Sequence, residues 1–543
     1  MTSVPDRARG RSILPFALLA LLCAGLSLLH AGTIPFMGKD EPKNAEALRE
    51  MMERGDWVTP TLAGEPWFDK PVLYYWVSLI FFHGIGPGEL AARLAPALFG
   101  AAGVLLTYAF GMSLLGSKTA LRGAVILATS LEYFWFSRTA VVDLPLTFCV
   151  TLALVAFYRA AEGMGRPALW YRVAFAAAGG AVLAKGPVGL VLPALVGGAY
   201  LAASGRLREL RRIPWISGPL CFLLVAGPWY LTVTLRHGRR FWDDFIINRN
   251  VDRYLTTVHH HPGPIYYYLP VLILGMFPWG ALLPFAAAKA VGRDWRQLRT
   301  SRRALGFLLL WVLMPLLFFS LAGSKLPSYL LPCFPALALL AAWGWGEVIE
   351  ERGGSRTRWA AIGFLLLLFP VFAAAIYAWC RGEAPDQIPA QIPIAAGLAA
   401  TAALLGFLAF RRRFGMLFPA CAAGTVLCLT MLIVFSLGNV REKASLVRIS
   451  AEAVRLTEEG NVVVAYRNFH NSLFFYTRNR VPWVKQRGLL DELLRERKGL
   501  YCLLEERGLR ELREDPALSV EIVDRQQKVT LARVVRREAG GGA

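Results

Sequence analysis

The sequence is poor in charge and lacks several common catalytic and metal-binding motifs. Only 18% of its 543 residues are charged, whereas 55% are hydrophobic and lie in repeated long runs. No Cys-x-x-Cys pair occurs among the eight cysteines, so neither a thiolate metal site nor a disulfide framework is predicted. There is no His-Glu-x-x-His motif, and the polar tail has no glycine-rich phosphate loop. The long hydrophobic runs are typical of a multi-span helical membrane protein.

The positive charge of the chain is distributed in a way that argues against nucleic acid as a partner. The net charge is +21, but much of the excess lies in short clusters between hydrophobic runs. Such clusters are the topology signal of an inner-membrane protein, and they also attract anionic lipids. We therefore expect the lipid bilayer, and no nucleic acid, as a partner.

About 13 membrane-spanning helices are predicted from the hydrophobic runs. The first run is longer than the hydrophobic core of a usual signal peptide, so we interpret it as an uncleaved span. Several runs are shorter than the ~20 residues of an ideal span. Their approximate limits are 12–30, 89–115, 119–137, 140–161, 168–183, 187–203, 214–235, 266–290, 303–322, 327–348, 357–380, 390–410 and 414–437.

Basic residues predict the orientation of these spans. With the N-terminus inside, the inner loops carry the arginine clusters at 206–212, 293–303, 352–358 and 411–413. The short outer loops carry about one cation each, at Arg138, Lys185, Lys325 and Arg381. This asymmetry agrees with the positive-inside rule and supports the span count.

The chain divides into a transmembrane domain and a polar tail. Residues 1–437 form the predicted transmembrane domain, with long outer loops at 31–88 and 236–265, and residues 74–86 read as a helix lying in the membrane interface. Residues 438–543 alternate helical stretches with the predicted strands 461–466, 499–505 and 518–524. The fold class is therefore an all-α polytopic membrane protein with a small C-terminal α/β domain in the periplasm.

Acidic residues at the ends of spans are the first candidates for chemistry. Asp40 and Glu41 follow the first span, and Asp143 lies with Arg138 at the outer turn before the fourth. A carboxylate at membrane depth is costly and usually has a partner or a function, here a general base or a cation ligand. The alternative for Asp40 is a helix N-cap, because Pro42 and a helical pattern follow it.

Isolated cations form the second group of candidates. Lys70 next to Asp69 precedes an aromatic run, and Lys185 and Lys325 lie in apolar surroundings at outer span ends. They are suited to a lipid phosphate or another anionic group, although interfacial anchoring explains them as well. Near residues 247–270, Arg253 and three consecutive histidines precede another aromatic run, and at most two of these histidines can face one ion.

These acids and cations are predicted to face one side of the membrane, which favours a catalytic site at its outer surface that handles a lipid phosphate. A transporter would more often place such groups near the midplane, between repeated or broken helices, and no internal repeat is found. A non-enzymatic flippase for lipid-linked sugars remains the alternative from a different class.

Five stretches resemble the lipid A aminoarabinose transferases, which are GT-C membrane glycosyltransferases related to protein O-mannosyltransferases. They are DEPKNAEALREMMERGDWVTPTLAGEPWFDKPVLYYW (40–76), AVVDLPLTF (140–148), LAKGPVGLVLP (183–193), YYLPVLILGMFPW (267–279) and SKLPSYLLPCFPALALL (324–340). The resemblance implies transfer of a sugar, with 4-amino-4-deoxy-L-arabinose as the candidate, from undecaprenyl phosphate. The acceptor would be lipid A or another membrane-anchored molecule on the periplasmic face of the inner membrane. A protein O-mannosyltransferase is the alternative within the superfamily, but the tail has no β-trefoil repeat.

The resemblance also assigns roles to individual residues. The essential acid of the first loop corresponds to Asp40, with Glu41 beside it, and the second acid corresponds to Asp143. The donor phosphate would be held by Lys70, Lys43 and Arg253, because the Arg that family members carry near His261 is replaced here by Pro and Gly. Further substrate-binding candidates are Arg138, Lys185, Lys325 and Tyr329. No cofactor is required, and a divalent cation at Asp69 and His261 is kept as an alternative.

Overall fold

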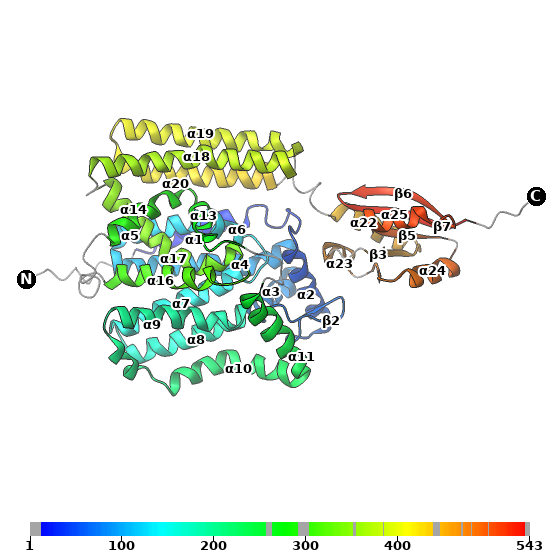
Figure 1. Ribbon diagram of the computed structural model, residues 1–543, viewed down its shortest axis with the longest axis horizontal. Helices are drawn as coiled ribbons and strands as arrows, with labels where there is room; N and C mark the ends of the chain where they lie inside the picture. The colour runs from blue at the N-terminus through cyan, green and yellow to red at the C-terminus, as the bar shows by residue number, and fades with distance from the viewer. Residues whose placement is uncertain are drawn as a thin grey trace, which may run out of the picture. The chain divides into compact units, whose positions relative to one another are not determined.

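The contacts of the computed structural model divide the chain into two units (Figure 1). The structure describes residues 12–256, 263–291, 303–350, 354–383, 385–437, 446–467, 471–478, 480–497 and 499–537. The membrane unit comprises the chain up to Leu29, Phe68–Tyr74 and Arg93–Ile433. The loop-and-tail unit comprises His30–Trp67, Tyr75–Ala92 and the residues from Val434 onward. Parts of the first outer loop thus group with the tail, while the predicted division into domains at residue 437 stays a prediction.

Long apolar helices build the membrane unit. Within the described ranges, nine helices are long and apolar enough to cross a membrane. They are α4 (Glu89–Leu115), α7 (Asp143–Ala161), α8 (Pro167–Lys185), α10 (Ser217–His237), α16 (Arg303–Ser320), the continuous η4, α17 and η5 (Pro327–Glu350), α18 (Ser355–Glu383), α19 (Ile388–Phe410) and α20 with η7 (Phe414–Leu437). The chain is thus a multi-pass membrane protein.

The remaining predicted spans are short or broken helices. α1 (Leu14–Leu28) and α9 (Val188–Ala203) are apolar but shorter than the nine. α5 (Ser117–Thr129) and α6 (Leu131–Phe136) are separated at Ser130, whose backbone is extended. α13 (Tyr268–Gly275) and the segment of η3 (Trp279–Leu282) and α14 (Leu283–Val291) are bent by 118°. Only glycine fits the bend, because a Cβ on Gly280 would lie 2.1 Å from the carbonyl oxygen of Ile273.

The predicted outer loop at 236–265 is helical as far as Leu255. It forms α11 (Arg239–Phe241), the π-helix η2 (Trp242–Asp252) and α12 (Arg253–Leu255). Phe241 and Phe245, one turn apart, are both buried and stack with ring centroids 5.5 Å apart. A helical arrangement puts two such residues on one face, so packing of this apolar pair stabilises helix over loop.

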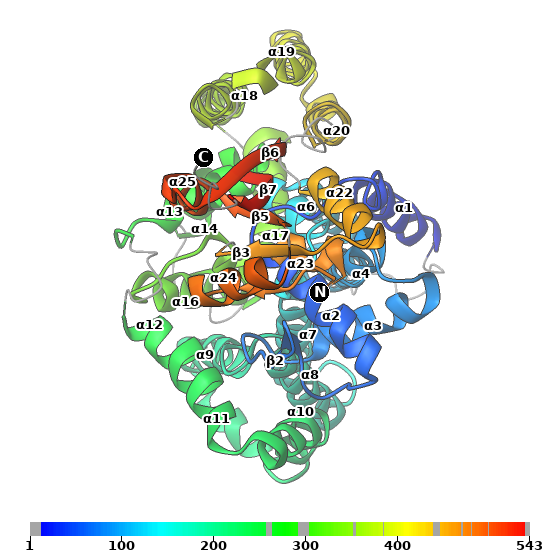
Figure 2. The ribbon, with the colours of Figure 1, turned by 90° about the vertical axis from the view of Figure 1, so that its right-hand side faces the viewer.

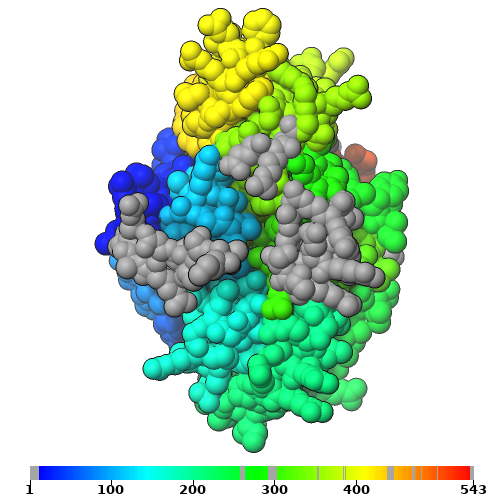
Figure 3. All heavy atoms as spheres, turned by 90° about the vertical axis from the view of Figure 1, so that its left-hand side faces the viewer, coloured from blue at the N-terminus to red at the C-terminus, as the bar shows by residue number. Residues whose placement is uncertain are grey.

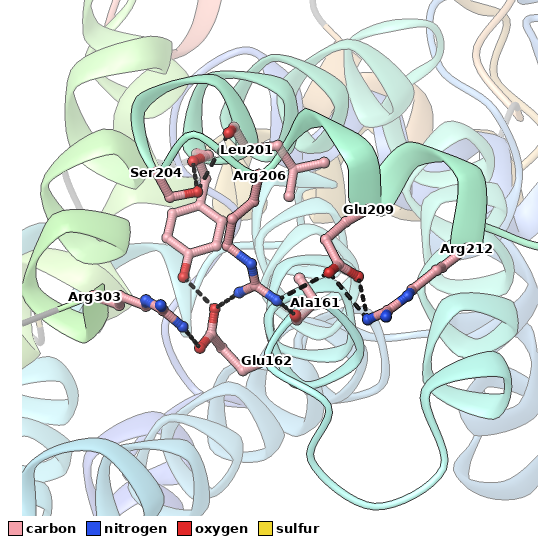
Figure 4. A network of polar contacts seen from close by, with 9 residues as sticks. Ala161, Glu162, Leu201, Ser204, Arg206, Glu209, Arg212 and Arg303 are labelled. Carbon is pink, nitrogen blue, oxygen red and sulfur yellow. Dashed lines mark hydrogen bonds and ion pairs between the residues drawn. The ribbon is translucent and has the colours of Figure 1, made fainter. Parts of the chain in front are cut away.

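α7 lies at the centre of the membrane unit and carries a polar network at its end. Of the apolar stretch of α7, 78% is buried inside the protein, compared with 22% for α10. Just after α7, Glu162 accepts hydrogen bonds from the Tyr200 hydroxyl at 2.6 Å, from Arg206, and from Arg303 Nη1 at 3.2 Å (Figure 4). Figure 3 looks onto the end of the membrane unit where the loops after α7, α9 and α19 are exposed. The network joins the first two of these loops and the start of α16.

The tail folds into helices on both faces of a five-stranded sheet (Figure 2). The strand order is β4 (Trp483–Val484), β3 (Val463–Tyr466), β5 (Leu500–Glu505), β7 (Val529–Arg536) and β6 (Leu518–Gln526). β3 is parallel to both β4 and β5, whereas β7 is antiparallel to β5 and β6. Three of these strands lie at the predicted positions.

Alternation along β3 explains the two faces of the sheet. Val464 and Tyr466 belong to the core under α24 (Arg487–Glu496) and α25 (Glu506–Glu514). Val463 and Ala465 belong to the core under α22 (Val447–Glu458) and α23 (Asn471–Thr477). Successive side chains of a strand point to opposite faces, so a strand that is apolar at every position needs cover on both.

The first outer loop supplies the rest of the loop-and-tail unit. It contains α2 (Asp40–Arg54), the two-residue strands β1 (Thr61–Leu62) and β2 (Glu65–Pro66), and α3 (Leu73–Ile85), close to the predicted interfacial helix. α2 ends at Gly55, whose positive φ of 62° lets the chain turn away. α2 packs against α23 of the tail.

Replacing Glu162 with Gln is expected to destabilise the membrane unit by about 3 kcal/mol, because Arg206 and Arg303 would lose their shared negative partner. The side chain of Glu162 is only 12% exposed. The measurement is the midpoint of thermal unfolding of the purified protein in detergent. Glu452→Gln, which breaks an exposed pair with Arg455, is the control and should change the midpoint little. Equal midpoints for Glu162→Gln and the wild type would show that the network contributes nothing.

Candidate active site

An ion pair joins the ends of two neighbouring helices of the membrane unit. Asp143 is the first residue of α7 and Lys185 the last of α8. The Lys185 ammonium donates a hydrogen bond to Asp143 Oδ1 at 2.6 Å. Both side chains are mostly buried, with 10% of Asp143 and 15% of Lys185 exposed. Because α7 and α8 are consecutive helices that pack along their length, two charges 42 residues apart meet at one end.

A second carboxylate brings together the segment before α3 and the helix η2. Asp69 Oδ1 lies 3.4 Å from Lys70 Nζ and 3.4 Å from Arg249 Nη1. Asp69 and Lys70 are 18% and 17% exposed. The carboxylate thus has two cationic partners from different parts of the chain.

Tyr329 lies between the two groups of charges. Its ring centroid is 5.3 Å from Lys185 Nζ and 5.9 Å from Arg253 Cζ, both within the range of cation–π attraction. Arg253 is one helical turn from Arg249, and its buried Nε has no hydrogen-bond partner within the described residues. Tyr329 is held on η4, which packs against α7. We call Asp69, Lys70, Asp143, Lys185, Arg249, Arg253 and Tyr329 the basic cluster.

The basic cluster has an excess of positive charge, because four cations surround two carboxylates. Burial opposes ionisation of Asp69, but Lys70, Arg249 and Arg253 outweigh it and lower the pKa of this carboxyl to about 2. Burial lowers the pKa of the Lys70 ammonium, and Lys185 and Arg253 act in the same direction while Asp69 opposes them. An anionic group bound here would relieve the repulsion between the cations.

Asp40, Glu41 and Lys43 lie in the loop-and-tail unit, at the start of α2. The Asp40 carboxylate is 74% exposed and lies 3.8 Å from Lys43 Nζ. Asp40 is the first helical residue and makes no capping hydrogen bond, whereas Glu41 Oε2 accepts one from the backbone N–H of Met37 at 2.8 Å. The alternative of an N-cap at Asp40 is therefore wrong, and its carboxylate is open to solvent.

Three other predicted substrate or metal residues have different surroundings. The Arg138 guanidinium donates hydrogen bonds to the carbonyl oxygens of Leu26 and Leu29. These bonds supply partners for carbonyl groups at the end of α1 and account for the burial of the Arg138 side chain. Lys325 Nζ donates to the carbonyl oxygen of Ala322 at 2.7 Å. His261 lies outside the described residues. Their substrate and metal roles stay predictions, and no cluster of three or more His, Cys, Asp or Glu suited to a metal occurs in the part of the chain that the structure describes.

Sequence reasoning did not single out Arg249 as part of the site. Its contact with Asp69 depends on the helical form of η2, which places Arg249 and Arg253 on one face. The four-residue spacing was the available signal, but it carries meaning only in a helix, and this segment is predicted as a loop.

The chain is similar to several known proteins. A model of the dolichyl-phosphate-mannose-protein mannosyltransferase family matches residues 69–231. An undecaprenyl phosphate-alpha-4-amino-4-deoxy-L-arabinose arabinosyl transferase of Aeromonas hydrophila subsp. hydrophila is 32% identical over 390 residues, which is 70% of each chain. A protein of the same name from Yersinia pestis (strain Pestoides F) is 34% identical over 367 residues, or 66% of this chain and 64% of the relative.

A solved structure shares the fold over nearly the whole chain. ArnT from Cupriavidus metallidurans bound to undecaprenyl phosphate matches with a TM-score of 0.80 and 23% sequence identity. The match covers 96% of this chain and 97% of that one.

Replacing Asp143 with Asn is expected to destabilise the protein by about 3 kcal/mol, because Lys185 would stay buried next to other cations without its partner. The double variant Asp143→Asn with Lys185→Met removes both charges and should recover part of that loss. Thermal unfolding in detergent measures both effects. Asp243→Asn is the control, since Asp243 pairs with Arg239 at an exposed site and should contribute little. A double variant that is less stable than Asp143→Asn alone would contradict the interpretation of Asp143 and Lys185 as a coupled pair.

Proposed function

Because the chain belongs to the family of undecaprenyl phosphate-α-4-amino-4-deoxy-L-arabinose arabinosyl transferases, we propose that it transfers this aminosugar from undecaprenyl phosphate to lipid A. The observation that carries the proposal within the molecule is the basic cluster, which gathers four cations and Tyr329 at one end of the membrane unit. The transfer takes place on the periplasmic face of the bacterial inner membrane.

The basic cluster binds the phosphate of the donor. Lys70 and Arg253 are the principal ligands, since other cations lie close to Lys70 and, among the residues that the structure describes, the buried Nε of Arg253 has no hydrogen-bond partner. Arg249 supplies additional positive charge in place of the Arg that family members carry near His261. Preorganised charge is most effective in a site that excludes water, because it needs no rearrangement as the reaction proceeds.

The reaction is a direct displacement at the anomeric carbon of the sugar. An oxygen of the acceptor forms the new bond to this carbon, and the bond from the carbon to the donor phosphate oxygen breaks, with inversion. The electron pair of the broken bond leaves with undecaprenyl phosphate, whose new negative charge is stabilised by the basic cluster. If the acceptor is a phosphate monoester dianion, no proton has to be removed, whereas a hydroxyl acceptor passes its proton to a carboxylate.

Asp40 orients the acceptor, and Asp143 acts from the donor side. The exposed carboxylate of Asp40 is suited to receive a hydrogen bond or to hold a cation next to the acceptor, and Lys43 at 3.8 Å adds a positive charge that attracts phosphate. Asp143 fixes the Lys185 ammonium, and through it the charge next to Tyr329. No resident cofactor is required for these steps, and a divalent cation remains an alternative for the acceptor side.

The topology of the proposal is that of 13 spans with the tail in the periplasm. The nine long helices, the bent pair, the two short apolar helices and the broken α5–α6 segment occupy all 13 predicted ranges. An odd number of spans with the N-terminus inside puts the sheet domain outside, on the side of the single outer cations.

Binding of undecaprenyl phosphate is expected to weaken as pH rises through the lowered pKa of Lys70, because only the ammonium form attracts phosphate. The contribution of Lys70 to affinity is complete below that pKa and is lost above it, at a lower pH than for an ordinary lysine. Lys70→Arg should keep binding at high pH, since a guanidinium stays charged. Lys70→Ala should weaken binding by roughly 10- to 100-fold at neutral pH. Titration of the lipid at several pH values checks this.

The control for this titration is Lys118→Ala, which removes a lysine that is 68% exposed and paired with Glu350. It should leave the affinity and its pH dependence unchanged. A pH profile shared by the wild type and Lys70→Arg would exclude Lys70 as the titrating group.

Replacing Asp40 with Asn is expected to reduce transfer by at least about 100-fold while leaving affinity for undecaprenyl phosphate unchanged. Mass spectrometry of lipid A after reaction with the aminosugar donor measures the product. Glu53→Gln is the matched control, because Glu53 is a half-exposed carboxylate at the other end of the same helix. Near-normal product from Asp40→Asn would remove Asp40 from the mechanism.

A further inference from the structure

One tyrosine of the tail joins the two ends of the first outer loop. The hydroxyl of Tyr476, on α23, accepts a hydrogen bond from the backbone N–H of Phe36 at 3.0 Å. The same hydroxyl donates to Glu89 Oε1 at 2.8 Å. Phe36 lies near the start of the loop that follows α1, and Glu89 is the first residue of α4. A single polar group therefore fixes both ends of the segment that carries Asp40.

Aromatic packing holds this contact in place. The ring of Phe36 lies edge-on to Phe475, with ring centroids 5.0 Å apart, and 6.2 Å from the ring of Tyr476. Phe36 is 3% exposed and Phe475 is 7% exposed. The start of the loop is thus anchored in the tail by a buried side chain as well as by its backbone.

The anchored segment leads directly to Asp40. The next backbone N–H, that of Met37, donates to Glu41 Oε2 at 2.8 Å, so two successive amide groups before α2 have fixed partners. Asp40 itself is 74% exposed, and it forms an ion pair with Lys43 in the next turn. Since little packing surrounds the Asp40 side chain, its place depends on the backbone at the start of α2, which these contacts hold.

We infer that Tyr476 is a positioning residue for glycosyl transfer, which acts by holding the start of α2 so that Asp40 meets the acceptor. The inference rests on the proposed function of Asp40. On this inference the tail contributes to catalysis, although every residue of the basic cluster belongs to the membrane unit. Misplacement of a catalytic group by about 1 Å can reduce a rate about 100-fold, so one lost hydrogen bond is sufficient to matter.

Tyr476→Phe tests the inference, because it keeps the ring and removes only the hydroxyl. The expected result is a kcat about tenfold lower, with unchanged affinity for undecaprenyl phosphate. Hydrogen exchange of the backbone amides in residues 36–54 should become faster, while that of β3 and β5 stays as in the wild type.

Tyr466→Phe is the matched control within the same domain. The Tyr466 hydroxyl donates to Glu511 Oε1 at 2.8 Å, so this variant also loses one tyrosine-to-glutamate hydrogen bond. Both partners lie in the tail, on β3 and α25. A purely structural role of the tail predicts similar losses for the two variants, whereas the inference predicts normal kcat for Tyr466→Phe.

Substitutions at Glu89 test the same contact without changing the tail. Glu89→Gln keeps an acceptor oxygen for the Tyr476 hydroxyl and should retain kcat, whereas Glu89→Ala should reproduce the loss seen in Tyr476→Phe. The two Glu89 variants test the role of the Tyr476 hydroxyl even if Tyr476→Phe fails to fold.

Normal kcat in Glu89→Ala, or equal losses of kcat in Tyr466→Phe and Tyr476→Phe, would overturn the inference. Failure of the proposed function is recognised separately, since the wild type itself would then give no product from the aminosugar donor.

Discussion

The membrane unit depends on compensation of buried charge. In surroundings of low polarity an isolated ammonium or carboxylate is costly, so each charge needs a partner that arrives from another part of the fold. Asp143 receives Lys185, and Asp69 receives Lys70 and Arg249. Because the cations of this cluster outnumber its acids, an anionic ligand such as a phosphate would lower the repulsion between the cations.

The charged groups are divided between the two units according to what holds them. Asp143, Lys185, Arg249, Arg253 and Tyr329 of the basic cluster lie on helices of the membrane unit, whereas Asp69 and Lys70 lie in the segment before α3. Asp40 lies at the start of a helix that packs against the tail, and its position depends on hydrogen bonds of the preceding backbone. In the proposed reaction the basic cluster holds the donor phosphate, and the exposed carboxylate of Asp40 meets the acceptor.

Much of the site was visible in the sequence because single charges stand out in apolar surroundings. Lys70, Asp143 and Lys185 are predicted on that basis and Arg253 from the family resemblance, and the structure brings these four residues together, whereas their roles stay predictions. Arg138 is visible in the sequence for the same reason, yet its guanidinium donates hydrogen bonds to carbonyl groups at the end of α1. Arg249 and Tyr476 were missed, since one lies in a segment with no recognised periodicity and the other in an ordinary apolar helix. A residue type in a pattern indicates the cost of its burial but does not identify the partner that offsets it.

Sequence patterns alone predict the class of the protein, the positions of its long apolar helices and the alternation of its tail. These features follow from local periodicity and from hydrophobic length, which any short window of the chain contains. The contacts of Asp143 with Lys185, of Arg249 with Asp69, and of Tyr476 with Phe36 and Glu89 follow from the folded arrangement of the chain. Such contacts join residues up to 440 positions apart, and they form because whole helices pack against one another. No local pattern encodes them, since the geometry that selects each partner exists only once the chain has folded.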